Sequence, residues 1–275
     1  MKPAAFAYAR PRTLEEAVRL LAENPDAKLL AGGQTLGPML NLRLVQPGLV
    51  VDITRIEELT RVEDEGGFVT LGACVTHAAI EDGRITDPSN GFLAEVAHGI
   101  AYRAVRNRGT IGGSLAHADP AADWLSCLTA IGADILLTGP QGRRRLALGD
   151  FVRGAMDTEL RHDEIVDGVR IPKFAKGARA GFAKICRKTG EFAEAIGVAV
   201  SDAERGVLRL VAGATQGRPI VIDASGTGSG AGFPSATNAR ALREELRLGG
   251  FTGDSYELNI HAAALGRAVE RAQSR

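Results

Sequence analysis

The stretch RNRGTIGGSLAHADPAAD, residues 106–123, contains the pattern that decides the fold. It holds an adjacent glycine pair, Gly112 and Gly113, which is followed directly by a hydroxyl side chain. Nearer the N-terminus, the stretch AGGQT at residues 31–35 repeats this composition, with a glycine pair followed by an amide and a hydroxyl. Because glycine accommodates positive φ and close backbone approach, these stretches are candidates for tight turns or for contact with a ligand.

Two loops of this composition can point several backbone N–H groups into one concavity, where a phosphate approaches the backbone closely. Residues 31–35 are called the first glycine stretch below, and residues 110–114 the second. The first glycine stretch also leads into a predicted helix, whose N-terminus favours an anion. For either stretch alone, a tight turn with positive φ is the simpler interpretation, but the two together favour a site for the pyrophosphate of a dinucleotide. Neither matches G-x-G-x-x-G or G-x-x-x-x-G-K-[ST], so neither a Rossmann site nor a P-loop is expected.

Local patterns predict an α+β chain in three parts, with boundaries at 1–54, 55–173 and 174–275. In the first part, Thr13 and Glu16 form a capping-box pattern before an apolar helical repeat. The expected elements are a helix at 13–23, a strand at 28–30, a short helix at 36–42 and a strand at 49–53.

The middle part predicts strands at 68–73, 134–138 and 163–172, and helices at 76–80, 91–105 and 124–131. A hairpin turn at 139–142 leads to a return strand with three successive arginines, 143–145. This run is interpreted as solvated charge on an edge strand, with partner docking as the alternative.

The last part predicts a three-stranded sheet from residues 180–187, 196–202 and 207–214, with helices at 237–248 and 256–273. A Gly/Ser/Ala-rich segment at 223–232 is interpreted as a flexible linker.

Composition excludes several classes of function. Lys plus Arg and Asp plus Glu both number 33, so a nucleic-acid partner is not expected. No run of apolar residues is long enough for a transmembrane helix or a secretory signal, so a cytoplasmic protein is expected. The three cysteines, Cys74, Cys127 and Cys186, are far apart and are expected to be buried thiols. They have no zinc spacing and are too few for an iron–sulfur cluster.

With these motifs in place, the sequence resembles the FAD-binding medium subunit of molybdenum hydroxylases, the group that includes carbon-monoxide dehydrogenase and xanthine dehydrogenase. The resemblance rests on residues 30–36 (LAGGQTL), 106–123 and, more weakly, 187–193 (RKTGEFA), and it covers nearly the whole chain. It implies a two-part FAD-binding region of the vanillyl-alcohol oxidase and UDP-N-acetylenolpyruvoylglucosamine reductase type, followed by the C-terminal three-stranded sheet with helices.

The resemblance also implies which residues hold FAD, with the two glycine stretches clasping the pyrophosphate. The implied contacts are Leu29, Leu30, Ala31, Gly32, Gly33, Gln34, Thr35, Leu36, Ala101, Asn107, Thr110, Ile111, Gly112, Gly113, Ser114, Asp123, Lys184 and Phe192.

The resemblance gives Asp123, Lys184 and Phe192 specific roles, each with a simpler alternative. Asp123 would accept a hydrogen bond from the sugar-alcohol chain of the flavin, or would be a helix N-cap. Lys184 would face the ring system, or would be a surface lysine. Phe192 would cover one face of the isoalloxazine, or would be a core residue. Glu191 stands where the family has Asp, which leaves the local turn open.

No catalytic side chain and no metal site are expected, because the cofactor itself carries the redox chemistry. His117 lies in the second stretch and is interpreted as a hydrogen-bonding residue that orders it. The other histidines, His77, His98, His162 and His261, have no clustered partners in the sequence and are interpreted as structural.

The function implied by the resemblance is electron transfer. A large partner subunit would hold the molybdopterin cofactor, a small partner would hold two [2Fe-2S] clusters, and FAD on this chain would pass electrons to an external acceptor. The family often assembles as a dimer of heterotrimers. The alternatives are a stand-alone flavin-dependent oxidoreductase, for which the last hundred residues are small, and a scaffold without FAD, which would not need the glycine pairs.

Overall fold

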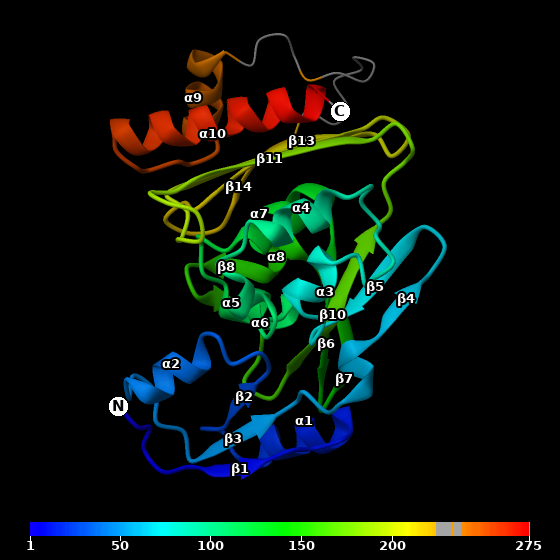
Figure 1. Cartoon of the computed structure of the whole chain (residues 1–275), viewed down its shortest axis with the longest axis vertical. Coiled ribbons are helices and arrows are strands. Elements are labelled where there is room, and N and C mark those ends of the chain that lie inside the picture. Colours follow the sequence, from blue (N-terminus) through cyan, green and yellow to red (C-terminus); the bar gives the residue numbers. More distant parts are fainter. Residues whose placement is uncertain (224–232, 234–237, 275) are drawn as a thin grey trace.

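A computed structural model describes residues 1–223, 233 and 238–274 of the chain. Its sheets follow one another along the molecule, and Figure 1 shows them as layers from the N-terminal part (blue) to the C-terminal helices (red). The predicted α+β class is confirmed. The predicted linker at 223–232 lies almost entirely outside the described residues.

The first layer is a parallel sheet with the strand order β1-β3-β2. Helix α1 begins where predicted, because Thr13 Oγ1 accepts a hydrogen bond from the Glu16 N–H. The Glu16 carboxylate bonds the N–H of Arg12 instead of that of Thr13, so the capping box is shifted by one residue. The elements are β1 (Ala7–Ala9), α1 (Leu14–Glu23), β2 (Lys28–Leu30), α2 (Leu36–Asn41) and β3 (Leu49–Asp52).

The middle layer is an antiparallel sheet with the order β4-β5-β10-β6-β7, and helices pack on it. A small hairpin, β8-β9, lies beside it. The elements are η1 (Glu57–Thr60), β4 (Val62–Asp64), β5 (Phe68–Gly72), α3 (His77–Glu81), α4 (Phe92–His98), α5 (Arg103–Arg106), α6 (Ile111–His117), α7 (Asp123–Ile131), β6 (Asp134–Gly139), β7 (Gly142–Ala147), α8 (Leu148–Phe151), β8 (Val152–Gly154), β9 (Asp157–Thr158) and β10 (Ile165–Pro172).

The C-terminal layer is an antiparallel sheet with the order β11-β12-β13-β14, and it has one strand more than predicted. The missed strand, β14, is short and lies at the edge of the sheet beside β13. Helices α9 and α10 cover the outer face in Figure 1. The elements are β11 (Arg179–Ile185), β12 (Ala195–Asp202), β13 (Val207–Gly213), β14 (Ile220–Asp223), α9 (Ala239–Leu248) and α10 (Ser255–Gln273).

Two predictions for the middle part were wrong. The helix expected over 91–105 is two helices, because the chain turns after α4 and Ala101 adopts a φ of 41°. The second glycine stretch, expected as a loop, begins α6 instead. The arginine run does lie on an edge strand, β7, as predicted, but Arg144 turns inward and forms an ion pair of 2.7 Å with Glu164.

Helix α7 joins the middle part to the C-terminal sheet. All its residues are buried, and it packs against β12 and β13. Arg209 donates to the carbonyl oxygens of Thr129 and Ala130, and Arg205 donates to that of Ile131, so the sheet satisfies carbonyl groups at the helix C-terminus. Such orphan carbonyls are costly to bury without donors. One apolar core therefore runs from α1 to the inner face of the C-terminal sheet.

Candidate cofactor site

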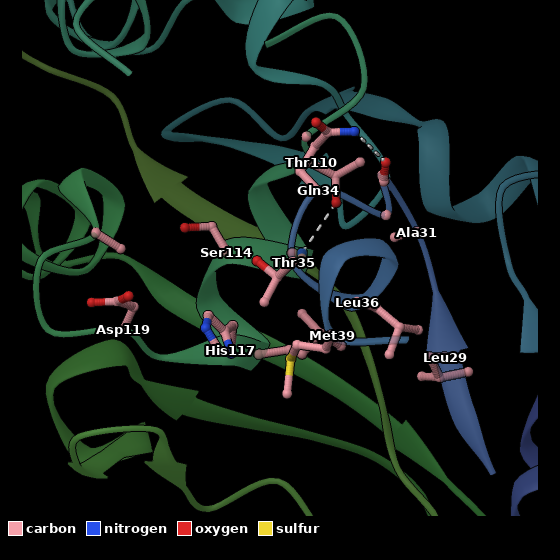
Figure 2. A pocket seen from close by; sticks show the side chains of 18 of the residues that line it. Leu29, Ala31, Gln34, Thr35, Leu36, Met39, Thr110, Ser114, His117 and Asp119 are labelled. Atoms are coloured by element: carbon pink, nitrogen blue, oxygen red, sulfur yellow. Dashed lines mark hydrogen bonds between the residues drawn. The ribbon is translucent and has the colours of Figure 1, made fainter. Parts of the chain in front are cut away.

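A cavity of about 840 Å³ lies where the three parts meet. It is lined by the first glycine stretch with α2, by the start of α6, by the segment before β10 and by residues of the C-terminal part. The predicted site residues line this cavity, with the exception of Leu30, Asn107 and Ile111. Figure 2 shows Gln34 and Thr35 beside Thr110 and Ser114 inside it.

The first glycine stretch is a turn that packs directly on the second motif. Gly33 has a φ of +71°, as a tight turn requires. A Cβ at Gly32 would lie 2.1 Å from the carbonyl oxygen of Arg108, so no larger residue fits there. The backbone N–H groups of residues 33–36 have no acceptor among the described residues, and these residues line the cavity. The turn thus presents free N–H donors, as the sequence predicted.

The second glycine pair lies in the first turn of α6, and neither glycine has a positive φ. Gly112 packs against Ala73, whose Cβ would be 2.3 Å from a Cβ at position 112. Gly113 lines the cavity, and a Cβ there would lie 4.0 Å from Ala31 Cβ, at van der Waals contact with the first stretch. The two motifs therefore meet, although they are far apart in sequence.

The N–H groups of the second stretch are already used within the protein. Those of Ile111 and Gly112 donate to the Val75 and Ala73 carbonyl oxygens, and that of Gly113 donates to Thr110 Oγ1 at 3.1 Å. The expectation that both stretches offer free backbone donors is therefore wrong for the second. Its contribution to the cavity is a glycine surface and the Ser114 side chain.

The exceptions among the predicted residues have other roles. Leu30 ends β2, and its side chain lies against Gly33. Ile111 is buried in the core. Asn107 is exposed, and its side chain accepts a hydrogen bond of 2.9 Å from Arg103.

Arg106, the first residue of the second motif, shapes the cavity from outside. Its guanidinium donates to the carbonyl oxygens of Ile100 and Ala101, and it forms an ion pair of 2.7 Å with Glu81. Hydrogen bonding from Arg106 lowers the pKa of Glu81 to about 2. Arg106 thus holds the turn at Ala101, a residue that lines the cavity.

Asp123 and Lys184 form a buried pair in the cavity wall. Lys184 Nζ lies 2.9 Å from Asp123 Oδ1 and donates to the Gly99 carbonyl oxygen at 2.7 Å. Lys184 is therefore not a surface lysine, and Ala122, not Asp123, occupies the N-cap position of α7. Burial raises the pKa of the Asp123 carboxyl, although the Lys184 ammonium opposes this shift. The Oδ1 atom is close to that ammonium but lacks an aligned hydrogen-bond donor among the described residues.

Phe192 is 74% exposed at the cavity rim, so the core interpretation was wrong. It follows Gly190, which has a φ of +89° and packs on the Tyr102 ring. Of the cysteines, Cys74 and Cys127 are buried as expected, whereas Cys186 is half-buried.

The histidines differ in their surroundings. His77 is buried, and its Nδ1 accepts a hydrogen bond of 3.1 Å from the Trp124 indole N–H. Burial, with a smaller effect of Arg106, lowers the pKa of His77 to about 4. His98 contacts Glu81, and His261 contacts two backbone carbonyl oxygens. His117 lines the cavity, but no hydrogen bond of its side chain occurs among the described residues, so the ordering role predicted for it is not seen.

The sequence interpretation missed one wall of the cavity. Met39, Leu42 and Leu44 contribute apolar surface from α2 and the following turn, and residues 158–166 contribute a polar segment. The Arg144–Glu164 pair fixes this segment, because Arg144 also donates to the Glu159 carbonyl oxygen. No motif marked these residues; the signal available was the acidic pair Asp163 and Glu164 directly before an apolar strand.

The cavity fits a dinucleotide in several respects. Its volume lies in the range of small-molecule and cofactor sites. The free backbone N–H groups of residues 33–36 can donate to a phosphate. Asp123 Oδ1, which has no aligned donor among the described residues, can accept from a hydroxyl group. Among the described residues, no group of three or more His, Cys, Asp or Glu side chains could hold a metal ion. No described helix is long and apolar enough to span a bilayer.

Comparison with known proteins supports the same assignment. The family described as the FAD binding domain in molybdopterin dehydrogenase matches residues 4–174. The chain belongs to this family. This FAD-binding domain protein is 35% identical to the nicotine 6-hydroxylase medium subunit of Paenarthrobacter nicotinovorans, over 96% of this chain and 92% of that protein. It is 32% identical to the carbon monoxide dehydrogenase medium chain of Afipia carboxidovorans, over 100% of this chain and 99% of that one.

Solved structures agree. A chain of the carbon monoxide dehydrogenase from Hydrogenophaga pseudoflava superposes with a TM-score of 0.87 at 33% identity, over 100% of this chain and 99% of that one. The predicted fold type and the resemblance to medium subunits are confirmed. As a member of the molybdopterin dehydrogenase FAD-binding family, the chain is a subunit of an oxidoreductase.

Proposed function

We propose that the chain binds FAD in the cavity and serves as the electron-transfer subunit of a molybdenum hydroxylase. Bound FAD would supply the redox chemistry that links a [2Fe-2S] partner subunit to an external acceptor. The observation that carries the proposal is the meeting of the two glycine stretches in the lining of one cavity that the Asp123–Lys184 pair also lines.

Different residues of the cavity would bind different parts of FAD. The free N–H groups of residues 33–36 would donate to the pyrophosphate, and Gly113 would leave room for it. Asp123 would accept from a hydroxyl of the sugar-alcohol chain, with Lys184 compensating its buried charge. Phe192, exposed at the rim, would stack on the ring system.

The partners we propose are a large subunit with the molybdopterin cofactor and a small [2Fe-2S] subunit, assembled as a dimer of heterotrimers. The relatives named as medium chains support this division. The three cysteines of the chain are unpaired, which suits the reducing cytoplasm that we propose as its location. Mass measurement of the complex that co-purifies with the tagged chain tests the stoichiometry; a chain that purifies alone contradicts it.

The first test is the visible spectrum of the purified chain, and of its co-expressed complex, before and after acid release of the chromophore. Flavin bands and released FAD are expected. A complex that contains all its subunits but no FAD would contradict the proposal.

The site itself is tested by Gly113→Val, which places a branched side chain where the pyrophosphate would lie. We expect a folded protein that retains no flavin. Gly67→Val is a matched control, because a Cβ at Gly67 has open space around it, its φ is not positive, as at Gly113, and Gly67 lies outside the cavity. Normal FAD content in a folded Gly113→Val protein would contradict the assigned site.

A further inference from the structure

His77 is a buried histidine with one unused ring nitrogen. Its side chain is 5% exposed, and it lines the cavity at the point where α3 meets the start of the second motif. The Nε2 atom has no hydrogen-bond partner among the described residues, whereas Nδ1 accepts from Trp124. Unlike Asp123 Oδ1, the Nε2 atom is not fully buried, and His77 lines the cavity, so a group that enters the cavity can reach Nε2 and pair with it.

Trp124 decides which nitrogen carries the proton. An indole N–H can only donate, so the Nδ1 atom that it contacts must hold a lone pair. The neutral imidazole then carries its single proton on Nε2, which makes Nε2 a hydrogen-bond donor. A second proton on Nδ1 would break the contact with Trp124, and burial beside Arg106 also disfavours the charged ring. The ring is thus set in one tautomer before any ligand arrives.

At the Nε2 edge of His77, the second motif has a glycine in place of a residue with a side chain. Gly109 packs on that edge, and a Cβ at position 109 would lie 2.9 Å from Nε2 and 2.8 Å from Cδ2. Both Gly109 and His77 line the cavity, and the backbone N–H of His77 donates to the Gly109 carbonyl oxygen, which holds the start of α3 against the motif. The glycine therefore allows the ring to reach the cavity wall.

We propose that His77 donates a hydrogen bond from Nε2 to an acceptor atom of the bound FAD, and that Trp124 positions it by holding the tautomer. The inference rests on the proposed function and adds a direct donor from α3 to the cradle. The acceptor is a phosphate oxygen of the cofactor or a polar atom of its flavin half.

The test compares two substitutions that each keep one half of the imidazole. In His77→Asn, the amide oxygen can replace Nδ1 as the acceptor for Trp124, but the Nε2 donor is lost. In His77→Gln, the longer amide places an N–H donor near the Nε2 position. Titration of the flavin-free chain with FAD is expected to show about tenfold weaker binding for Asn and recovery to within about threefold of wild type for Gln.

A matched control is His261→Asn, since His261 is also buried but has a backbone carbonyl oxygen within hydrogen-bond distance of each ring nitrogen and lies outside the cavity. It should lose stability without a change in FAD affinity. Trp124→Phe removes the donor to Nδ1 and should weaken FAD binding a few-fold, with ¹⁵N spectra of His77 showing a mixture of tautomers in place of the Nε2–H form.

The outcomes separate this inference from the proposed function. If wild-type protein binds FAD and both His77 variants bind equally well, water satisfies Nε2 and the inference is wrong. If wild-type protein in its complex binds no FAD, the proposed function itself fails. When binding falls as expected, a changed ³¹P spectrum in His77→Asn identifies a phosphate acceptor, and a shifted visible flavin band identifies the flavin half.

Discussion

The two glycine pairs have nearly the same sequence and different structures. The first forms a turn with free N–H groups, whereas the second begins a helix whose N–H groups are already bonded. All four glycines line the cavity. In each pair the first glycine is required by packing, with Gly32 against a backbone oxygen and Gly112 against Ala73, whereas a Cβ at the second, cavity-facing glycine would meet only side-chain atoms. The comparison shows that two copies of a glycine pair can share the same packing requirement and still differ in whether their backbone N–H groups are free for a ligand.

The largest effect is expected from a methyl group at the packed glycines. Gly112→Ala puts a Cβ 2.3 Å from Ala73 Cβ, and Gly32→Ala puts one 2.1 Å from a carbonyl oxygen. Such overpacking should lower the free energy of unfolding by about 3 kcal/mol in each case, measured by urea denaturation.

Gly37→Ala in α2 is the control for these variants. Nothing lies within 4 Å of the added Cβ, so stability should stay level or rise by about 0.5 kcal/mol. If Gly112→Ala lowers the free energy of unfolding no more than Gly37→Ala does, packing does not require a glycine at position 112, and the distinction between packed and cavity-facing glycines is contradicted.

The cavity-facing glycines should differ from each other. Gly33→Ala forces a side chain into a φ of +71° and should cost about 1 kcal/mol. Gly113→Ala meets the Thr110 hydroxyl that caps α6 at 2.9 Å, but alanine favours a helix more than glycine does, so the net effect on stability should stay within about 0.5 kcal/mol. Thermal melts of both variants check this order. Equal losses of stability would show that the positive φ at Gly33 does not make that position more sensitive to a side chain than Gly113.

The two threonines that precede the helices sharpen the same contrast. Thr110 caps α6 through its hydroxyl, whereas Thr35 makes no side-chain capping bond to α2. Thr110→Ala should therefore cost about 1 kcal/mol of unfolding free energy, and Thr35→Ala close to none. A large loss for Thr35→Ala would show an unrecognised bond at the first stretch.

Acid tests two groups that pack near the second glycine stretch, His77 and Glu81. His77 has a pKa of about 4, below its unfolded value, so its neutral form favours folding above pH 6.5 and this contribution is lost between pH 6.5 and 4. Glu81, with a pKa of about 2, favours folding above pH 4.5 and loses its contribution as the pH falls toward 2.

Glu81→Gln tests the acid effect. The variant should be less stable than wild type at pH 7, and the difference should shrink as the pH approaches 2, measured by urea denaturation across this range. An unchanged difference would show that Arg106 does not depend on the Glu81 charge.

Much of this architecture could be predicted from the sequence, because strong local signals mark it. Thr13 and Thr76 start helices where predicted, and most apolar runs are strands. Strand β14 was missed because it is short and lies at an edge. The helix that begins at Thr110 was missed because two glycines argue against helix by propensity, and packing on Ala73 overrides them.

The site could be predicted in composition but not in geometry. The glycine motifs identified most of the lining residues, since the requirement for bare backbone is visible in sequence. The pairing of Lys184 with Asp123 and the inward turn of Arg144 depend on contacts between distant segments. No local pattern encodes such contacts. The same holds for His77, because its contact with the distant Trp124 decides which ring nitrogen is left without a partner in the chain.

The cavity draws its walls from all three parts of the chain, and this has a consequence for the life of the protein in the cell. A ligand that binds only the assembled state stabilises it by an amount that grows with the logarithm of ligand concentration. Chains without cofactor would then unfold more often than loaded chains, and proteases would degrade more of them. The concentration of FAD in the cell would in this way influence the abundance of the subunit.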